Sequence, residues 1–599
     1  MKFLLLSALA ICVSAQDKPA QVEPQPRKDV VVVTGSYEPV PLEESERTVR
    51  VFDVQRDRTL VNSVSEYLQM DASVDLRRRA PGDVQGDLSI RGGTFSQTLV
   101  LLNGMRLNNA QTGHATMDLP VSLDAISEIQ VLHGSGSTEY GSDAVTGVVN
   151  LIVKPPSTEA RIRAALGNFG TNSESGTVAL SGKRLMQSFV FSRDFSTGFM
   201  PDRDYRNLSL ASVTHATTGL GATDILLAHS DRPFGADQFY GNYPSWERTK
   251  GWFASLRQDL GSRTEVDFSF RRGSDLFVLY RDRPELFTNR HVLESWQAAV
   301  RRHEDLGATS RLSYGVESYA DRIDSNNLGG HSRARGAGYV SWDARVLRRF
   351  SLTLGLRDEF YGSFNHELSP TLAGGAWLNS RVKVRAAVSR AFRVPTYTDL
   401  YYHDPANVGS PNLRPEKAWN YEGGADWQVA PRVRASATVF HRRDTDVIDY
   451  VRYSPTDIYR ATNFQRLRFT GFEGMVEWAL RRGHVINAQY TAMRGDRVPE
   501  PGAISKYVFN YPIHSAVATW QGRVRNAVAF RTRIGAVKRF ERDPYAVCDL
   551  SATRATGRVR PFLQFTNLTS TVYQEIPGVA MPKFGVVGGV ELRLYGDLH

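Results

Sequence analysis

Between residues 157 and 595 the chain alternates apolar and polar residues in short runs separated by turns or polar loops. A period of two places successive side chains on opposite faces of an extended strand, so each run predicts a half-buried β-strand. The clearest runs have these apolar positions: Ile162, Ala164, Leu166; Val266, Phe268, Phe270; Phe350, Leu352, Leu354, Leu356; Val382, Val384, Ala386, Val388; Val433, Ala435, Ala437, Val439; and Val590, Leu592, Leu594.

The other face of these strands decides between a soluble sandwich and a membrane barrel. Lys383, Arg385, Arg434 and Arg593 all fall opposite the apolar positions. No predicted helix covers the apolar face, so a closed transmembrane barrel with lipid outside and a polar lumen satisfies both faces. At roughly 20 residues per strand and loop, residues 157–599 hold about 22 antiparallel strands. A barrel of this width is expected to carry a plug in its lumen.

The segment before the barrel predicts that plug, a small α/β domain over residues 47–156. Strands are predicted at residues 49–54, 99–102, 129–132 and 148–153. A short helix is predicted from residue 63 to residue 68, with Ser63 as its N-cap and Glu66 completing a capping box. The predicted fold is therefore an all-β transmembrane barrel with an N-terminal α/β plug inside its lumen.

The first fifteen residues, MKFLLLSALAICVSA, predict a cleaved signal peptide over residues 1–15. They combine the charged Lys2, an apolar run and a small final residue. Lipidation at Cys12 is the alternative, which the large Ile11 before it disfavours. Cleavage leaves Cys548 as the single cysteine, so no intramolecular disulfide is expected.

Residues 16–46 predict a flexible, Pro- and Glu-rich arm interrupted by a valine run. The run comprises Asp29, Val30, Val31, Val32, Val33 and Thr34. Consecutive valines favour an extended strand, and a strand within a mobile linker offers backbone groups for strand addition by a partner. An edge strand of the following domain is an equal alternative.

The charge pattern argues against two classes of function. Net charge is +10, but the basic residues are scattered among acidic ones rather than gathered in a stripe, so no nucleic-acid partner is expected. The 13 histidines are too dispersed to indicate a catalytic constellation, so the chain is not expected to be an enzyme.

Several motifs resemble those of the TonB-dependent outer-membrane receptors, and the resemblance covers nearly the whole chain after the signal peptide. The plug carries IRGG at 90–93, LVLLNGMR at 99–106, EIQVLHG at 128–134 and YGSDAVTGVVN at 140–150. The barrel carries SRAFRVP at 389–395, PNLRPE at 411–416, GFE at 471–473 and TNL at 566–568. The run DVVVVT at 29–34 resembles the TonB box, which favours the strand-addition interpretation.

The resemblance implies a monomeric receptor in an outer membrane of the Gram-negative type. It contacts outer-membrane lipid there and takes up a scarce ligand with energy from a TonB-type transducer of the inner membrane. One departure concerns the C-terminus, because chains of this family usually end on an aromatic residue, whereas Tyr595 is followed by four more residues. How this tail affects barrel assembly is open at this point.

Within the family, the plug resembles that of cobalamin receptors. Residues 107–120 and 79–87 fall where those receptors place two substrate-contacting plug loops, and residues 234–240 resemble a barrel segment of theirs. The candidate substrate-binding residues are Asn108, Asn109, Gln111, Thr112, His114, Phe239 and Tyr240. Amides, a hydroxyl and an imidazole suit the amide rim of a corrinoid, although any polar plug apex offers similar groups.

Haem and ferric siderophores are the alternative ligands. His403 lies between the SRAFRVP and PNLRPE motifs, the interval in which haem receptors place an axial histidine, and His114 would supply a second axial ligand. No resident cofactor is expected; Asp231 and Asp237 are candidates for calcium in an outer loop, though two carboxylates are few for such a site. A passive porin or an adhesin is the alternative of a different class, and it would need neither the plug nor the valine run.

Overall fold

The computed structural model describes residues 31–32, 40–42, 45–346, 349–362, 365–480, 483–496, 502–525 and 527–596. The predicted signal peptide, most of the predicted arm and the last three residues lie outside these ranges, as do Asp29, Val30, Val33 and Thr34 of the valine run. No helix within the described ranges is long and apolar enough to cross a membrane.

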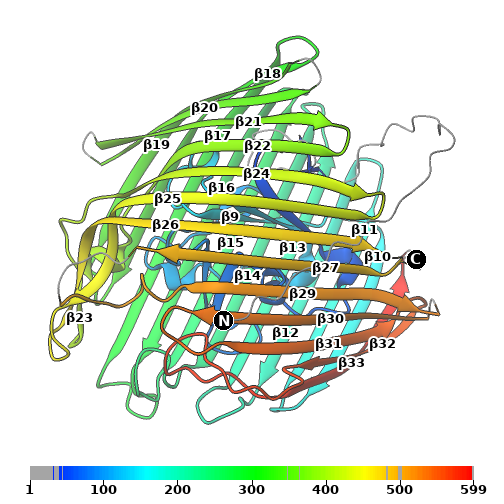
Figure 1. The fold of residues 1–599 in the computed structure, drawn as a ribbon. Helices are drawn as coiled ribbons and strands as arrows, with labels where there is room; N and C mark the ends of the chain where they lie inside the picture. Colours follow the sequence, from blue (N-terminus) through cyan, green and yellow to red (C-terminus); the bar gives the residue numbers. More distant parts are fainter. Residues whose placement is uncertain are drawn as a thin grey trace, which may run out of the picture.

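From Glu159 to Tyr595 the described residues form a closed barrel of 22 long antiparallel strands (Figure 1). The last strand pairs with the first, with Leu592 opposite Ile162. The strands are β10 (Glu159–Gly167), β11 (Asn172–Ser181), β12 (Leu185–Ser196), β13 (Tyr205–Thr217), β14 (Ala222–Gly235), β15 (Trp246–Leu260), β16 (Thr264–Val278), β17 (Thr288–Asp305), β18 (Ser310–Ser325), β19 (His331–Val346), β20 (Phe350–Tyr361), β21 (Asn365–Asn379), β22 (Val382–Arg393), β24 (Glu416–Ala430), β25 (Val433–Arg452), β26 (Tyr459–Ala479), β27 (Val485–Gly495), β29 (Pro512–Val524), β30 (Val528–Arg539), β31 (Tyr545–Arg554), β32 (Val559–Thr566) and β33 (Gly585–Tyr595). The predicted barrel is confirmed.

The two faces of the barrel wall follow the predicted alternation. In β20, Leu354 and Leu356 point outward and are 42% and 41% exposed, whereas Arg357 points into the lumen and is 3% exposed. In β22 the predicted inward residues Lys383 and Arg385 are buried. An outward apolar face suits contact with lipid, and an inward polar face suits contact with a plug and water.

One stretch of the inner wall departs from the predicted polar lumen. On β12 to β15 six inward side chains are apolar and join the hydrophobic core of the plug; they are Val190, Ala211, Val213, Leu226, Ala228 and Phe253. The plug side of this contact includes Leu119, Val121 and Leu123. Burying apolar area on both partners helps to hold this side of the plug against the wall.

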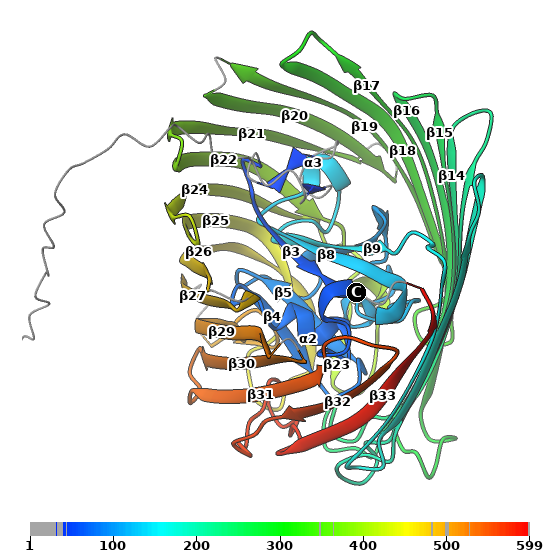
Figure 2. The same cartoon turned by 90° about the vertical axis from the view of Figure 1, so that its right-hand side faces the viewer.

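The plug lies inside the barrel (Figure 2). Its larger sheet has the strand order β3 (Thr48–Asp53), β8 (Ile126–His133), β9 (Gly147–Val153), β6 (Thr98–Leu102) and β7 (Met105–Arg106). A separate hairpin comprises β4 (Val74–Arg78) and β5 (Gly86–Ile90). The four strands predicted from the sequence correspond to β3, β6, β8 and β9.

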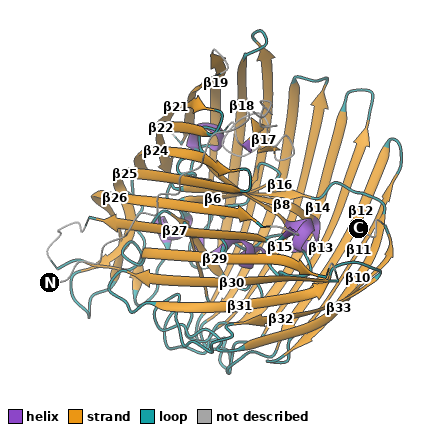
Figure 3. Cartoon of the chain, turned by 45° about the vertical axis from the view of Figure 1, so that its right-hand side comes forward, coloured by secondary structure: helices purple, strands orange, loops and turns teal. Residues whose placement is uncertain are grey.

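The described helices are short and belong to the plug, except for one in a barrel loop (Figure 3). They are α1 (Val54–Asp57), α2 (Val64–Leu68) and α3 (Ser137–Tyr140), with the 3₁₀ turns η2 (Gly113–Ala115) and η3 (Leu123–Ala125), and α4 (Tyr397–Tyr401) in the loop. The Ser63 hydroxyl caps α2 by accepting from the Glu66 N–H at 3.2 Å. The Glu66 carboxylate accepts from the N–H of Asn62, not Ser63, so the predicted capping box is only half formed.

The two ends of the barrel differ in their connections. At one end the strands are joined by short turns, and at the other by longer segments such as 236–245, 394–415 and 567–584. The longer segments include the two-residue strands β23 (Asn407–Val408) and β28 (Ile504–Ser505), which pair with β26 and β25. At the turn end, Lys383 Nζ donates to the carbonyl of Ser45 at 2.9 Å, so the chain leaves the N-terminal arm and enters the plug at this end.

Candidate functional site

The apex of the plug is formed by the loop between β4 and β5 and the loop that follows β7. The carbonyl of Arg79 accepts from Arg203 Nη1 at 2.9 Å. The carbonyls of Ala110 and Gln111 accept from the first two N–H groups of α4, each at 2.9 Å. Both plug loops, residues 79–87 and 107–120, therefore meet the loop end of the barrel, and their contact with substrate stays a prediction.

His114 lies at the centre of this apex. Its Nδ1 is 2.7 Å from Asp87 Oδ1, and Arg79 binds both oxygens of the same carboxylate at 3.0 and 3.2 Å. The imidazole stacks on Phe95 with ring centroids 4.2 Å apart and meets the ring of Tyr507 at 5.6 Å. Its side chain is 16% exposed, and no described residue forms a hydrogen bond with Nε2.

The protonation state of His114 follows from this environment. Burial lowers the pKa of His114 and outweighs the attraction of Asp87, since the Asp87 charge is already neutralised by Arg79. The ring is therefore neutral at neutral pH. With Nδ1–H donated to Asp87, Nε2 is left as an acceptor at the plug apex.

Four other predicted substrate residues hold the apex loop in place, three through contacts within the plug and Gln111 through strand β16 of the barrel wall. The Asn108 amide accepts from Val100 N–H at 2.8 Å and donates to the carbonyl of Thr98 at 3.0 Å. Asn109 accepts from the N–H of Gln111, and Gln111 donates to Asp275 Oδ2, each at 2.8 Å. Thr112 caps the η2 turn. These contacts fix the loop shape, and the prediction that the four residues bind substrate stays a prediction.

The two barrel candidates have different environments. Phe239 is 5% exposed and packs in an apolar cluster with Tyr205 and Phe234. Tyr240 is 41% exposed, and its hydroxyl lies 2.7 Å from Gln85 Oε1 and 2.8 Å from Glu247 Oε2. Tyr240 therefore connects the barrel loop to the plug apex, whereas Phe239 holds that loop by packing in the apolar cluster.

The alternative metal-related residues are not brought together by the described contacts. His403 is exposed and is held through its backbone by the side chain of Asn327. The Asp231 carboxylate is bound by Arg248 Nε and Nη2 at 2.8 and 2.6 Å. The described residues contain no group of three or more His, Cys, Asp or Glu arranged to hold a metal ion. The His403–His114 pair and the calcium site stay predictions.

A second cluster, absent from the sequence-based predictions, anchors the plug to β24 and β26. Arg91 binds both oxygens of Glu473 at 2.8 and 2.7 Å and reaches Glu422 at 2.7 Å. Glu422 also binds Arg47 at 3.0 Å. Arg91 has a left-handed backbone, with φ 49°, which non-glycine residues rarely adopt. The IRGG motif thus serves a backbone turn that presents Arg91 to the barrel.

His133 completes this anchor. Its Nε2 is 2.8 Å from Asp71 Oδ2 and its Nδ1 is 3.3 Å from Glu473 Oε2. Burial opposes protonation, but the charges of Asp71 and Glu473 outweigh it and raise the pKa of His133 to about 9. The ring is therefore an imidazolium at neutral pH, and it adds a positive charge between plug and wall.

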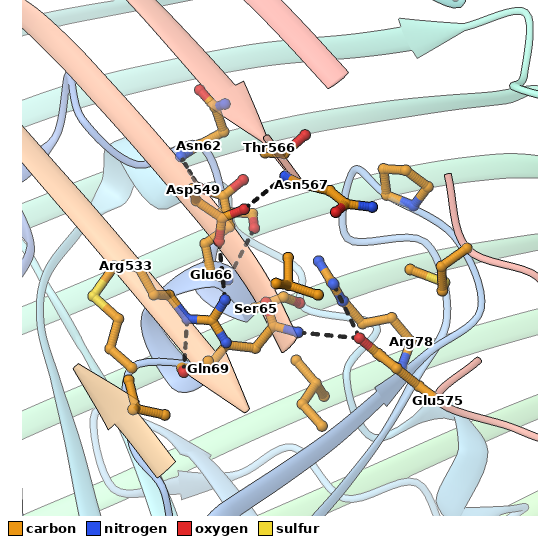
Figure 4. Close-up of a pocket in the computed structure, with 18 of the residues that line it drawn as sticks. Asn62, Ser65, Glu66, Gln69, Arg78, Arg533, Asp549, Thr566, Asn567 and Glu575 are labelled. Atoms are coloured by element: carbon orange, nitrogen blue, oxygen red, sulfur yellow. Dashed lines mark hydrogen bonds and ion pairs between the residues drawn. The ribbon is translucent and has the colours of Figure 1, made fainter. Parts of the chain in front are cut away.

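A cavity separates the plug from another part of the wall (Figure 4). It lies between α2 and β4 of the plug and strands β29 to β32. Arg533 donates to Asp549 and to the carbonyl of Gln69, and Arg78 binds Glu575 at 3.1 Å. Burial raises the pKa of Glu66, which faces this space, to about 7.

The valine run is described only at its centre. Strand β1 (Val31–Val32) pairs antiparallel with β2 (Val40–Pro41) of the same arm, with Val32 opposite Val40. This extended conformation agrees with the predicted strand. Its pairing partner is the arm itself rather than the larger sheet of the plug.

Two family models match the chain. The TonB-dependent receptor plug domain matches residues 41–148, and the TonB-dependent receptor-like beta-barrel matches residues 168–568. The vitamin B12 transporter BtuB of Vibrio vulnificus is 24% identical over 446 residues, covering 68% of this chain and 70% of the relative. The same transporter of Photobacterium profundum is 26% identical over 444 residues, covering 70% of each chain.

Solved structures share the fold at lower identity. The siderophore receptor PirA from Acinetobacter baumannii has a TM-score of 0.76 at 15% identity and covers 91% of this chain and 98% of that chain. The Serratia marcescens hemophore receptor HasR has a TM-score of 0.77 at 14% identity and covers 92% and 99%. Plug and barrel models together match most of the sequence, so the chain belongs to the TonB-dependent receptor family and serves TonB-dependent transport across the outer membrane.

Proposed function

We propose that this receptor takes up cobalamin or another corrinoid. The observation that carries the proposal is the similarity to two relatives named as vitamin B12 transporters, each aligned with at least 68% of this chain. Transport is already established from the family, so the proposal concerns only the identity of the ligand.

The plug apex supports the proposal by its chemistry. A corrinoid presents amides around its rim, which need both donors and acceptors. The accessible apex offers an acceptor at Nε2 of His114 and a phenol at Tyr240. Lys506 adds a cation above the apex, where its Nζ lies 5.3 Å from the ring of Tyr507 and donates to Asn407 at 2.8 Å.

The proposed mechanism is tight binding followed by energised release. The outer loops and the plug apex hold the ligand. A TonB-type transducer of the inner membrane adds a strand to residues 29–34 and pulls, so that the plug rearranges and the ligand passes. A partner strand on Val31 and Val32 competes with their pairing to β2.

Calorimetric titration of the detergent-purified receptor with cyanocobalamin tests the ligand, with haemin titrated in parallel. We expect saturable corrinoid binding that His114→Gln and Asn109→Ala weaken. Haemin binding that is lost in His403→Ala would favour the alternative ligand instead. If neither compound binds, the corrinoid proposal fails and the family assignment is unaffected.

The strand-addition step has its own test. Val32→Pro removes a backbone donor from the paired segment. We expect it to abolish energised uptake of radiolabelled cyanocobalamin by cells while leaving the affinity of the purified receptor unchanged. Val32→Ile, which keeps the donor and the β-branch, is the matched control and should transport normally. Loss of binding in Val32→Pro would contradict the separation of binding from release.

A further inference from the structure

The connections at the two ends of the barrel differ in charge as well as in length. In sequence, the ten short turns contain eleven basic residues and no acidic residue. The basic residues are Lys183, Arg184, Arg263, Arg348, Arg349, Arg381, Arg432, Arg481, Arg482, Arg525 and Arg558. The eleven segments at the other end contain thirteen acidic and eight basic residues. The excess of positive charge in the connections therefore lies at the turn end.

Seven of these basic residues are exposed and form no ion pair within the described part of the chain. They are Lys183, Arg184, Arg349, Arg381, Arg432, Arg525 and Arg558, and we call them the turn cations. Arg263 differs, because its Nη1 lies 2.9 Å from Glu304. Water solvates an exposed guanidinium, so exposure by itself indicates no partner. The position of the turn cations relative to the membrane is more informative.

Every turn cation lies within three residues of an outward apolar side chain. These apolar neighbours are Leu180, Leu185, Phe350, Leu378, Val429, Val524, Val528 and Val559. Leu185 is 58% exposed and Phe350 is 50% exposed, as expected for side chains that face lipid. At about 3.4 Å per residue, the turn cations lie within roughly 10 Å of the apolar band. This places them at the depth of lipid headgroups.

Outward aromatic residues mark the same border. Trp427 and Trp478 are exposed near the turn end, and Trp478 is directly opposite Val433, the residue that follows Arg432. Aromatic side chains of transmembrane barrels gather where lipid tails meet headgroups. The arm enters the plug at this end and meets a transducer of the inner membrane, so the turn end faces the inner leaflet. The turn cations therefore lie at the inner-leaflet headgroups.

The turn cations are spread around the barrel rather than gathered in one patch. They occupy six of the ten turns, those between β11 and β12, β19 and β20, β21 and β22, β24 and β25, β29 and β30, and β31 and β32. A bound protein covers one side of a barrel, whereas lipid surrounds all of it. The spread therefore favours lipid over a soluble acidic partner.

Three turn cations occupy consecutive turns. Arg349, Arg381 and Arg432 are separated by two strands each, or about 10 Å along the rim. This spacing is close to the Debye length of about 8 Å at physiological ionic strength, so their fields overlap at the membrane surface. No acidic turn residue offsets them. This arc is the part of the rim where the positive potential is most continuous.

We propose that the turn cations bind the headgroups of anionic phospholipids in the inner leaflet. Guanidinium groups bind phosphate oxygens in pairs, and a headgroup with net negative charge attracts cations at the membrane surface. The bound lipids fix the depth of the barrel. When the transducer pulls the arm, a barrel drawn inward would have to remove its turn cations from the headgroups. This role is independent of the ligand that the receptor transports.

Electron spin resonance of the full-length receptor in phosphatidylcholine membranes tests the proposal. Spin-labelled phosphatidylglycerol is the anionic probe and spin-labelled phosphatidylcholine is the reference, since the spectrum separates lipid held at the protein from bulk lipid. We expect wild type to associate with phosphatidylglycerol about threefold or more strongly than with phosphatidylcholine. R349Q/R381Q/R432Q should lower this preference about twofold or more.

The matched control is R281Q/R283Q/R414Q, which makes the same change of net charge at the loop end. These three arginines are exposed and lie beside Asp204, Asp282 and Asp446. The control should keep the lipid preference of wild type. Raising the salt concentration to about 1 M, where the Debye length is about 3 Å, should remove the preference of both proteins.

Thermal unfolding distinguishes lipid binding from a structural role of the arginines. In neutral detergent, R349Q/R381Q/R432Q should unfold at the same temperature as wild type, because it loses no ion pair. Added phosphatidylglycerol should raise the unfolding temperature of wild type and of the loop-end control more than that of the turn variant. An equal preference for phosphatidylglycerol in wild type and the turn variant, or no preference in wild type, would overturn the proposal.

Discussion

The plug contains two histidines that each contact an aspartate, and their protonation states are opposite. At the anchor, His133 lies between Asp71 and Glu473 and its pKa is raised to about 9. At the apex, Asp87 is the carboxylate that His114 contacts, and burial lowers the pKa of His114. The same pair of residue types therefore gives a cation in one region and a neutral ring in the other.

The difference comes from what else binds each carboxylate. Asp87 is already paired with Arg79 through both oxygens, so little attraction is left for a proton on His114. Two carboxylates face His133, one on each ring nitrogen, and together they outweigh the cost of burial. The anchor therefore contributes charge and stability, whereas the apex keeps a neutral ring whose second nitrogen is free to contact a ligand.

Glu473→Gln should have the largest effect, because it breaks the anchor and leaves the apex intact. Arg91 and His133 would lose a shared buried partner, at a cost of about 3–5 kcal/mol in the free energy that holds the plug in place. Limited proteolysis should cut the plug of this variant at lower temperature. Glu317→Gln is the control, since its partners Arg301 and Arg357 both belong to the barrel. Equal plug cleavage in both variants would contradict the anchor.

Alkaline pH should weaken the anchor and acid should weaken the apex. The stabilisation from His133 is complete below its unfolded pKa of about 6.5, and up to about 3 kcal/mol is lost as pH rises through about 9. The neutral His114 contributes at pH values above about 6.5 and loses its contribution as pH falls. Unfolding temperature against pH measures both effects.

Histidine variants show which residue causes the loss of stability at alkaline pH (the alkaline limb of the profile) and which causes the loss in acid (the acid limb). His133→Gln should flatten the alkaline limb of the stability profile and leave the acid limb. His114→Gln should flatten the acid limb and leave the alkaline limb unchanged. A profile in which either variant removes the limb assigned to the other would refute the assignment of charge states.

Asp87→Asn should have an intermediate effect, confined to the apex. Arg79 would keep only a neutral acceptor in a buried site, at a cost of about 1–3 kcal/mol in the free energy of unfolding. Asp231→Asn breaks a bidentate arginine pair that is partly exposed, so it should cost less than about 1 kcal/mol. Calorimetric unfolding of the two variants compares a buried pair with an outward one. Equal losses would indicate that burial at the apex does not matter.

The smallest expected effect concerns the ligand. His114→Gln removes one hydrogen-bonding ring nitrogen from the apex and should weaken cyanocobalamin binding about two- to tenfold. His133→Gln lies in the anchor and should leave the affinity unchanged within about twofold. Equilibrium binding to the purified receptors separates the two. A larger loss in His133→Gln than in His114→Gln would reverse the roles assigned to apex and anchor.

Much of the fold could be predicted from local pattern. The period of two identified the barrel strands, because each strand buries one face whatever its neighbours are. Leu354 and Leu356 are outward and Arg357 is inward, as their spacing requires. The pattern did not predict the apolar inner wall at Phe253, because both faces of that strand are apolar when a plug packs against the lumen side.

The candidate site was predicted only in part. The sequence located the apex loop and His114, because the loop follows a recognisable motif. It did not reveal that Asn108 holds the loop rather than facing away from it, or that Phe239 is buried. Nor did it reveal the anchor, since Arg91 and Glu473 lie 382 positions apart and no local signal joins them.

The sequence by itself determined which residues face outward from the barrel, and the family, because these depend on periodicity and contiguous motifs. Only the tertiary structure decided which charges meet. Closing the barrel around the plug brings Arg91 to Glu473. Charge–charge energies depend on distance and burial rather than on sequence separation, so the protonation of His114 and His133 follows only from the folded arrangement.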